Sequence, residues 1–375
     1  MRRQTLALSL CLSLGSLWLT AQTEAKSVRP QIQVALLLDT SNSMDGLINQ
    51  AKSQLWTFVN RFAPLRRDGQ SPELQVALYE YGKSSIPAGE GYMRQVLPFT
   101  TDLDKVSEQL FALTTQGGEE YCGMVIQVAT QGLAWSSSPR DLKVIFIAGN
   151  EPFTQGSVDY RTSCNFARTK DISVNTIFCG AYQQGVSSNW ADGAKLGGGS
   201  YMNIDQERHD VHLSAPQDTE IERLGVELNS TYIPIGVEGA RSAMNQATQD
   251  TNAAKSGAGS MNQRAQAKAS SFYRADAWDL VDAEKAGKKK LESMDKKELP
   301  IELQKMSPAE ARSYVDGKAK ARSEIQAKIR TLSVEREKYL VEKRKESAKG
   351  GVKTLDSAMI EALELLTRAK GFVSK

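Results

Sequence analysis

Apolar positions near the N-terminus follow two patterns in succession. Residues 32–38 form a nearly unbroken apolar run that ends at Asp39, which is typical of a strand buried on both faces and predicts the central strand of a sheet. Between residues 44 and 62 the apolar residues recur every three or four positions, the period of a helix that covers one face of a sheet. The chain therefore opens its ordered part with a buried strand followed directly by an amphipathic helix.

The same two patterns alternate as far as about residue 231. Strands predicted over 74–81 and 95–99 are joined by a Gly- and Pro-bearing loop too short for a crossover helix, which predicts an antiparallel pair. Helices are predicted over 102–113, 125–135, 164–169 and 218–228, and further strands over 142–148, 172–179 and 201–204. This alternation predicts an α/β fold over residues 31–231, Rossmann-like, with a doubly wound, mostly parallel sheet and one antiparallel edge strand.

Beyond residue 231 the strand signals stop, and the sequence predicts an all-helical C-terminal region. Residues 232–306 are expected to form a helical, partly irregular linker, in which 246–267 is loosely ordered and the aromatic segment 271–281 docks on the first domain. Ser307-Pro308-Ala309-Glu310 is a capping box that predicts the start of a long charged helix reaching toward Lys349.

A tail over residues 307–375 combines this long helix with a last amphipathic helix over 355–370, separated by Gly350-Gly351. Apolar residues of the long helix fall at heptad-like steps, but Arg322 and Arg336 lie on the same seam, which weakens a self-sufficient coiled coil. An antiparallel hairpin of the two helices and binding to a partner, including self-association through these C-terminal helices, stay open as alternatives.

The N-terminus indicates export. Met1-Arg2-Arg3 is followed by an apolar run over 6–19 and by small residues at positions 23 and 25, which predicts a signal peptide over residues 1–25 and a periplasmic or secreted protein. A membrane anchor is the alternative, but the run is shorter than the roughly 20 residues that span a bilayer. No later segment is long and apolar enough to predict a transmembrane helix.

Composition is that of a globular chain, with 40% hydrophobic and 24% charged residues and a formal net charge of +3. The basic excess lies in residues 284–353, which hold 20 basic and 12 acidic residues. One alternative function follows: a structural envelope protein whose basic helical tail contacts an anionic surface. Nucleic acid is not an expected partner, since the chain is predicted to be exported and lacks an aromatic and basic recognition pattern.

The residues with the clearest chemistry follow the first strand. Asp39-Thr40-Ser41-Asn42-Ser43 lies between the buried strand and the helix, so its side chains are expected at the carboxyl edge of the sheet, where such folds bind ligands. One carboxylate and two hydroxyls at alternate positions are hard oxygen donors, which suit Mg²⁺ first and Mn²⁺ or Ca²⁺ as alternatives. A purely structural role, in which these side chains cap the helix, is the other interpretation.

A strand that ends in Asp-Thr-Ser-Asn-Ser and continues into an amphipathic helix resembles the metal-ion-dependent adhesion site of von Willebrand factor type A domains, here of an exported bacterial type. The resemblance implies a divalent cation held by Asp39, Ser41 and Ser43. It also implies a protein partner that offers a carboxylate as the missing ligand. In the alternative function, that of a structural envelope protein with a basic tail, the VWA site is metal-free or structural.

The family pattern further asks for a threonine after a glycine pair and for an aspartate after the fourth major strand. This chain has Glu119 and Gly149 at those positions, with Asn150 and Glu151 next to the latter. We expect Glu119 and Asn150 to complete the metal site. A coordinating Glu119 would add negative charge and favour metal retention over adhesion.

The remaining chemistry is limited. After loss of Cys11 with the signal peptide, Cys122, Cys164 and Cys179 remain, and we expect one disulfide of Cys164 with either of the others to brace the loops around the site. An enzyme is not expected, because the only two histidines, His209 and His212, lie at a domain edge and no nucleophile elbow or zinc signature occurs.

Overall fold

A computed structural model describes residues 29–205, 213–346 and 355–374. The predicted signal peptide, His209, His212 and Gly350-Gly351 lie outside the described residues.

The predicted sheet is confirmed. β1 (Gln31–Asp39) lies between β3 (Glu73–Tyr81) and β5 (Leu142–Gly149), so the continuous apolar run is the central strand. The full order is β4-β3-β1-β5-β6-β7, with β4 at Arg94–Thr100, β6 at Ser173–Cys179 and β7 at Gly198–Ile204. β4 runs antiparallel to β3 at one edge, and the other neighbouring strands are parallel.

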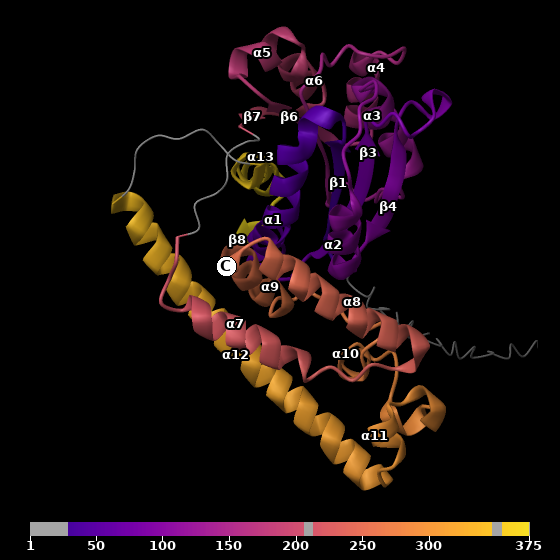
Figure 1. Ribbon diagram of the computed structural model, residues 1–375, viewed down its shortest axis with the longest axis vertical. Coiled ribbons are helices and arrows are strands. Elements are labelled where there is room, and N and C mark those ends of the chain that lie inside the picture. The colour runs from indigo at the N-terminus through magenta and orange to yellow at the C-terminus, as the bar shows by residue number, and fades with distance from the viewer. Residues whose placement is uncertain (1–28, 206–212, 347–354, 375) are drawn as a thin grey trace, which may run out of the picture.

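Helices cover both faces of the sheet (Figure 1). Leu36 and Leu38 of β1 enter a core shared with α1 (Asp45–Phe62) and α2 (Leu103–Ala112), whereas Ala35 and Leu37 enter the opposite core. That second core contains α3 (Cys122–Gly132), α4 (Tyr160–Thr169) and α6 (Trp190–Leu196). Alternate side chains of one strand thus supply two apolar layers, because they point to opposite faces. The sequence patterns missed α6 and the short α5 (Tyr182–Ser187) before it.

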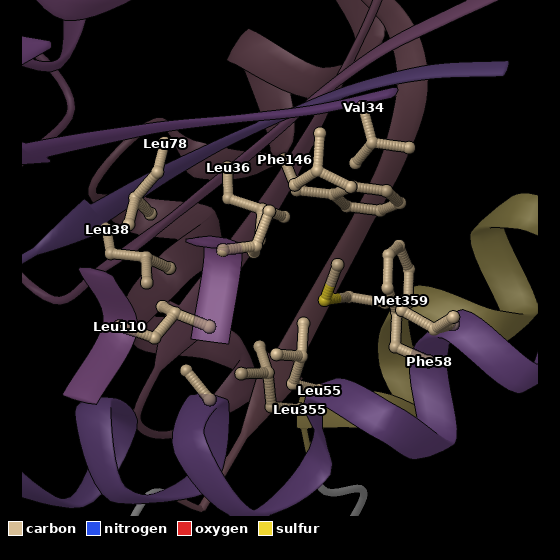
Figure 2. Close-up of a cluster of buried hydrophobic side chains, with 14 of the residues drawn as sticks. Val34, Leu36, Leu38, Leu55, Phe58, Leu78, Leu110, Phe146, Leu355 and Met359 are labelled. Carbon is tan, nitrogen blue, oxygen red and sulfur yellow. The ribbon is translucent and has the colours of Figure 1, made fainter. Parts of the chain in front are cut away.

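The last helix, α13 (Leu355–Ala369), completes the layer that contains α1. It packs against α1 and β7 rather than forming a hairpin with α12. Figure 2 shows Met359 beside Phe58 of α1, whose ring packs edge-on against Phe146 of β5 at a centroid distance of 6.3 Å. After α13, β8 (Val373–Ser374) pairs with β2 (Leu65–Arg66), which follows α1. Residues from the far end of the chain are therefore built into the α/β domain.

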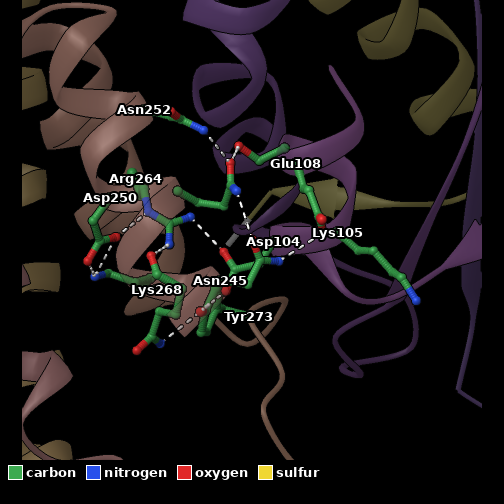
Figure 3. Close-up of polar contacts among 12 residues, drawn as sticks. Asp104, Lys105, Glu108, Asn245, Asp250, Asn252, Arg264, Lys268 and Tyr273 are labelled. Carbon is green, nitrogen blue, oxygen red and sulfur yellow. Dashed lines mark hydrogen bonds and ion pairs between the residues drawn. The ribbon is translucent and has the colours of Figure 1, made fainter. Parts of the chain in front are cut away.

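Helix α8 (Gly236–Lys255) packs against α2, α9 (Ala258–Lys268) packs against α1, and α7 (Asp218–Asn229) packs on α9. The expectation that residues 246–267 are loosely ordered is wrong, because they form most of α8 and α9. A buried polar cluster holds them: Arg264 pairs with Asp104 of α2 at 2.7 Å, and Lys268 pairs with Asp250 at 2.9 Å (Figure 3). The sequence showed these polar residues but not that they form ion pairs with one another inside the protein.

The long helix α12 (Pro308–Glu346) begins at the predicted capping box, in which Ser307 Oγ donates to Glu310 Oε2 at 2.7 Å. It runs beside α7 (Figure 1). Arg322 and Arg336 on its seam are buried and paired within the chain, with Asp279 and Asp218 respectively. The heptad-like seam of α12 therefore packs against other parts of the same chain. Short helices α10 (Leu280–Lys285) and α11 (Ile301–Gln304) lie before it, and none of the described helices is long and apolar enough to cross a membrane.

Candidate metal centre

The turn after β1 is held from both sides. The backbone N–H of Thr40 donates to the carbonyl of Tyr81 at 2.8 Å, which continues the pairing with β3. The N–H of Gln116 donates to the carbonyl of Thr40 at 2.8 Å and brings the loop before α3 to the same place. A short 3₁₀ turn over Asn42–Met44 then leads into α1. Asp39 therefore ends the strand at the carboxyl edge of the sheet, as the sequence predicted.

Four of the predicted ligands come together there. Asp39 Oδ1 accepts a hydrogen bond of 2.7 Å from the N–H of Ser41, and the hydroxyls of Ser41 and Ser43 lie 3.2 Å apart. Asn150, just beyond β5, donates from Nδ2 to Ser43 Oγ at 3.1 Å. Asp39 and Ser41 are buried, whereas Ser43 is exposed. The open side of the site is consequently the side of Ser43 and Asn150.

Glu120, not Glu119, is the acidic residue that enters the site. Glu119 is exposed, whereas Glu120 is 5% exposed and its carboxyl interacts with the side chains of Asp39 and Ser41. The preceding glycine pair fixes this register, because the carbonyl of Gly117 accepts from Ser84 N–H at 2.6 Å and a Cβ on Gly118 would lie 2.6 Å from that nitrogen. The two adjacent glutamates were visible in the sequence, but their orientation depends on this loop contact.

Two glycines leave room for the carboxyl groups of Asp39 and Glu120, called the carboxyl pair below. A Cβ on Gly82 would lie 2.7 Å from Asp39 Oδ1 and 2.8 Å from Glu120 Cγ. A Cβ on Gly149 would lie 2.5 Å from the hydroxyl of Tyr81 and 3.0 Å from Asp39 Oδ2. Gly149 occupies the position at which the family pattern has an aspartate. The surrounding atoms explain why this chain carries no side chain there.

The carboxyl pair lacks partners on one side. Asp39 Oδ2 and Glu120 Oε2 are both buried, and neither has a hydrogen-bond partner. Burial, followed by the neighbouring carboxyl in the case of Glu120, raises the pKa of both groups, and the carboxylate of Glu151 at the rim raises them further. Unpartnered carboxyl oxygens beside two hydroxyls are the donor set of a hard divalent cation, so these residues fit such an ion.

Glu80, a buried residue that the sequence analysis missed, stabilises the turn after β1. Glu80 of β3 is fully buried, accepts a hydrogen bond of 3.3 Å from Thr40 Oγ1 and pairs with Lys83 at 3.3 Å. Arg94 of β4 pairs with its other oxygen. These two cations compensate the buried charge. Glu80 therefore holds the residue next to Asp39 without itself facing the site.

The comparison with protein families agrees with the observed fold. Residues 33–191 match the model of the von Willebrand factor type A domain. The chain contains a von Willebrand factor type A (VWA) domain. Domains of this family often mediate protein–protein interaction, and most are not enzymes.

Solved structures with similar folds share little sequence with the chain. BatB from Bacteroides thetaiotaomicron is 16% identical over 46% of this chain and 90% of that one, with a TM-score of 0.36. An aerotolerance-related membrane protein from Bacteroides fragilis is 17% identical over 46% and 92%, with a TM-score of 0.32. The SpRpn10 VWA domain is 15% identical over 46% and 88%, with a TM-score of 0.36. No curated protein of similar sequence was found.

The expected disulfide is absent from the described part of the VWA domain. Cys122, Cys164 and Cys179 are buried free thiols. Cys122 and Cys164 belong to the core that contains α3 and α4, whereas Cys179 belongs to the core on the opposite face of the sheet. Burial raises the pKa of the Cys164 thiol to about 12, so the thiolate that forms disulfides is scarce. The sequence placed all three near one edge but did not show that side chains there point to different faces.

Proposed function

We propose that the VWA domain holds a divalent cation at Asp39, Ser41 and Ser43 and uses it to bind a protein partner. The observation that supports the cation is the pair of buried, unpartnered oxygens on Asp39 and Glu120. Mg²⁺ is the first candidate, and Mn²⁺ or Ca²⁺ are alternatives, because all three prefer oxygen ligands. From its N-terminal segment we place the protein outside the cytoplasm, in the periplasm or secreted.

An apolar spot on α5 supports a protein as the partner. α5 follows β6, whose end lies at the same edge of the sheet as Asp39, and there Tyr182 is 53% exposed and Val186 is 40% exposed. Trp190 Nε1 donates to the carbonyl of Glu151 at 2.8 Å, which fixes the helix after α5 to the rim of the metal site. Exposed aromatic and aliphatic side chains beside a polar centre are typical of protein interfaces. In the simplest version, a partner carboxylate completes the coordination.

The first experiment separates metal binding from partner binding. Isothermal titration of Mg²⁺ and Mn²⁺ into the full chain should show one site in the wild type and none in Asp39→Ala. Glu119→Gln is the matched control, since this exposed glutamate lies outside the site and should leave binding unchanged. Absence of any metal binding by the wild type would remove the proposal.

The second experiment concerns the partner. Wild type and Asp39→Ala are each used to capture proteins from an envelope extract, with and without chelator. We expect at least one protein that is retained only by the metal-loaded wild type. Four identical sets of captured proteins would contradict the metal bridge and leave the helical region as the recognition element. Contact of the basic tail with an anionic surface would instead weaken with salt and be insensitive to the chelator.

In the structure, acidic partners neutralise part of the basic charge that such a tail would present. Lys288 pairs with Asp276 at 2.6 Å and Lys289 pairs with Glu298 at 3.2 Å. Because both cations already have acidic partners, the lysine run at 288–290 offers less free charge than the sequence indicates. The metal site is therefore the better supported centre of recognition.

A further inference from the structure

A second polar site lies near the metal centre, where β3 meets the edge strand β4. It is a cleft of about 330 Å³ between the two strands and the loop that joins them. Its lining consists of charged, polar and apolar residues, namely Glu80, Lys83, Ser85, Ile86, Pro87, Glu90 and Arg94. We call it the Arg94 cleft. None of these residues is a candidate metal ligand, so the chemistry of the cleft is separate from that of the cation.

Arg94 is held in place although its side chain is 56% exposed. Its Nε donates to Oε1 of the fully buried Glu80, and the other oxygen of Glu80 accepts from Lys83 Nζ at 3.3 Å. Within the described chain, the two terminal nitrogens of Arg94 have no hydrogen-bond partner. A guanidinium that is anchored through one nitrogen still has N–H groups with which to bind a planar oxyanion in a forked geometry.

The loop that forms the rest of the cleft is ordered by its own hydrogen bonds. The N–H of Lys83 donates to the carbonyl of Tyr92 at 3.3 Å, and the N–H of Ile86 donates to the carbonyl of Lys83 at 3.0 Å. The N–H of Gly91 donates to the carbonyl of Ala88 at 2.9 Å. The cleft is therefore formed before any ligand binds, so binding does not have to offset the cost of ordering this loop.

The charges of the cleft favour a singly charged anion. At its buried end, Lys83 and Arg94 exceed Glu80 by one positive charge, and Glu90 on the loop is exposed. A carboxylate can pair with Arg94, whereas Glu90 would repel the second charge of a phosphate dianion. Among the described residues Glu90 has no ion-pair partner, so it can bind a cationic group that the same ligand carries.

We propose that the Arg94 cleft binds a carboxylate through the terminal nitrogens of Arg94, and that Glu90 favours a carboxylate with a cationic group close by. This chemistry has two sources: a free amino acid or short peptide, and an acidic side chain of a protein next to a lysine or arginine. The second source would place the cleft within reach of a partner at the metal centre, because β4 and β1 are two strand spacings, roughly 10 Å, apart. Binding of the carboxylate itself requires no metal.

Saturation-transfer difference NMR tests the cleft in the full chain, from which divalent cations have been removed with a chelating resin so that no probe binds to a metal. The probes are acetate, glycine and a peptide blocked at both ends, Gly-Asp-Gly-Lys-Gly, whose only carboxylate is a side chain. The same peptide with Asn in place of Asp is its control. Inorganic phosphate and acetate are compared as competitors of glycine.

Four variants are compared with the wild type. Arg94→Gln removes the charge, whereas Arg94→Lys keeps a cation beside Glu80 but lacks the planar fork. Glu90→Gln removes the acidic group on the loop. Arg241→Gln is the matched control, because Arg241 is 73% exposed and pairs only with Glu238 on its own helix.

We expect glycine to bind wild type and Arg241→Gln equally and to bind Arg94→Gln about tenfold more weakly, because a charge-assisted forked pair is lost. Arg94→Lys should also bind more weakly than wild type. Glycine should bind wild type more tightly than acetate does, and Glu90→Gln should abolish this difference. A blocked peptide that binds more tightly than glycine, and only in its Asp form, identifies a protein as the source, whereas tighter binding of glycine identifies a free small molecule.

The contrary outcomes are equally specific. Unchanged glycine binding in both Arg94 variants, or no binding of any carboxylate probe to the wild type, would overturn the inference. If Arg94→Gln does not fold, Arg94→Lys decides. A preference for glycine that persists in Glu90→Gln would refute the role of Glu90, and stronger displacement of glycine by phosphate than by acetate would refute the ligand class. Since no metal is present, failure here leaves the proposed metal site untouched, and failure of that site leaves this result untouched.

Discussion

The backbone N–H of Leu355 donates a hydrogen bond of 3.0 Å to Oε1 of Gln50, so the first residue of α13 is bound to the helix that follows the metal turn. The same glutamine donates from Nε2 to the carbonyl of Asp205, just after β7, at 2.8 Å. One buried side chain of α1 therefore joins the C-terminal helix to the last strand of the sheet. This polar contact accompanies the apolar contacts of Figure 2.

Removal of the Met359 side chain, which packs at the centre of the apolar contacts of α13, should destabilise the whole domain. Met359 is buried against α1 and the sheet, so Met359→Ala is expected to lower the free energy of unfolding by about 2–5 kcal/mol. Leu365→Ala on the same helix is the control, because Leu365 is 62% exposed and its loss should cost less than about 0.5 kcal/mol. Denaturant unfolding measures both. Equal costs would mean that α13 does not pack as described.

The buried pair of Asp104 and Arg264 predicts a second effect on stability. Asp104 on α2 accepts from Arg264 on α9 and from the hydroxyl of Tyr273 (Figure 3). Asp104→Ala leaves the guanidinium with Asp250 alone among the acidic partners, and we expect a loss of about 3 kcal/mol. Arg241→Ala, which breaks an exposed pair with Glu238, should change stability by less than about 0.5 kcal/mol. A loss as small for Asp104→Ala would contradict the role assigned to the cluster.

The α/β part of the fold was predictable because local patterns determine it. The run before Asp39 and the spacing of apolar residues in α1 depend on neighbours within a few positions, and both gave the correct element. α8 and α9 were misjudged because their buried residues include Arg264 and Lys268, which only distant acids make tolerable inside a protein. The position of α13 was unpredictable because its amphipathic pattern indicates that one face is buried but not which surface buries it.

The candidate site shows the same division. Asp39, Ser41 and Ser43 lie on one continuous turn, so their proximity followed from the sequence. Asn150 followed from the resemblance to the family, because it is next to the position at which the family pattern has an aspartate, and its side chain lies 3.1 Å from Ser43 Oγ. The choice between Glu119 and Glu120 depended on how a loop packs against Gly82 and Ser84, which no local pattern encodes. The pairing of Cys164 with Cys179 was wrong because the two side chains lie on opposite faces of the sheet, whereas Cys122 and Cys164 share one core and are still free thiols.

The space at Gly149 gives a third prediction. Gly149→Ala should lower the free energy of unfolding by about 1–3 kcal/mol, because the added Cβ meets the Tyr81 hydroxyl and Asp39 Oδ2. Gly149→Asp, which restores the residue of the family pattern, should also weaken metal binding by displacing Asp39. Gly132→Ala is the control, since its Cβ would meet only the Tyr79 hydroxyl at 3.7 Å, and it should be neutral or stabilising by up to about 1 kcal/mol. Tighter metal binding by Gly149→Asp would contradict the proposed geometry.

The buried carboxyls predict how stability without metal depends on pH. Burial, then the adjacent Asp39, raises the pKa of Glu120 above its ordinary value, so the folded state binds more protons than the unfolded state above about pH 4. Stability from this source is present at low pH and is lost as the pH rises toward the raised pKa. In chelator, the free energy of unfolding of wild type relative to Glu120→Gln should therefore fall between about pH 5 and pH 8.

Added Mg²⁺ should act in the opposite direction over the same pH range. The ion binds the deprotonated carboxylates, so its stabilising effect on the wild type should grow as the pH rises. Thermal unfolding of wild type, Glu120→Gln and Glu119→Gln, each with chelator or with Mg²⁺, measures both effects in one series. Glu119→Gln should follow the wild type because the side chain of Glu119 is exposed outside the site. If wild type and Glu120→Gln respond identically to pH and to Mg²⁺, Glu120 does not face Asp39 and is not part of the metal site.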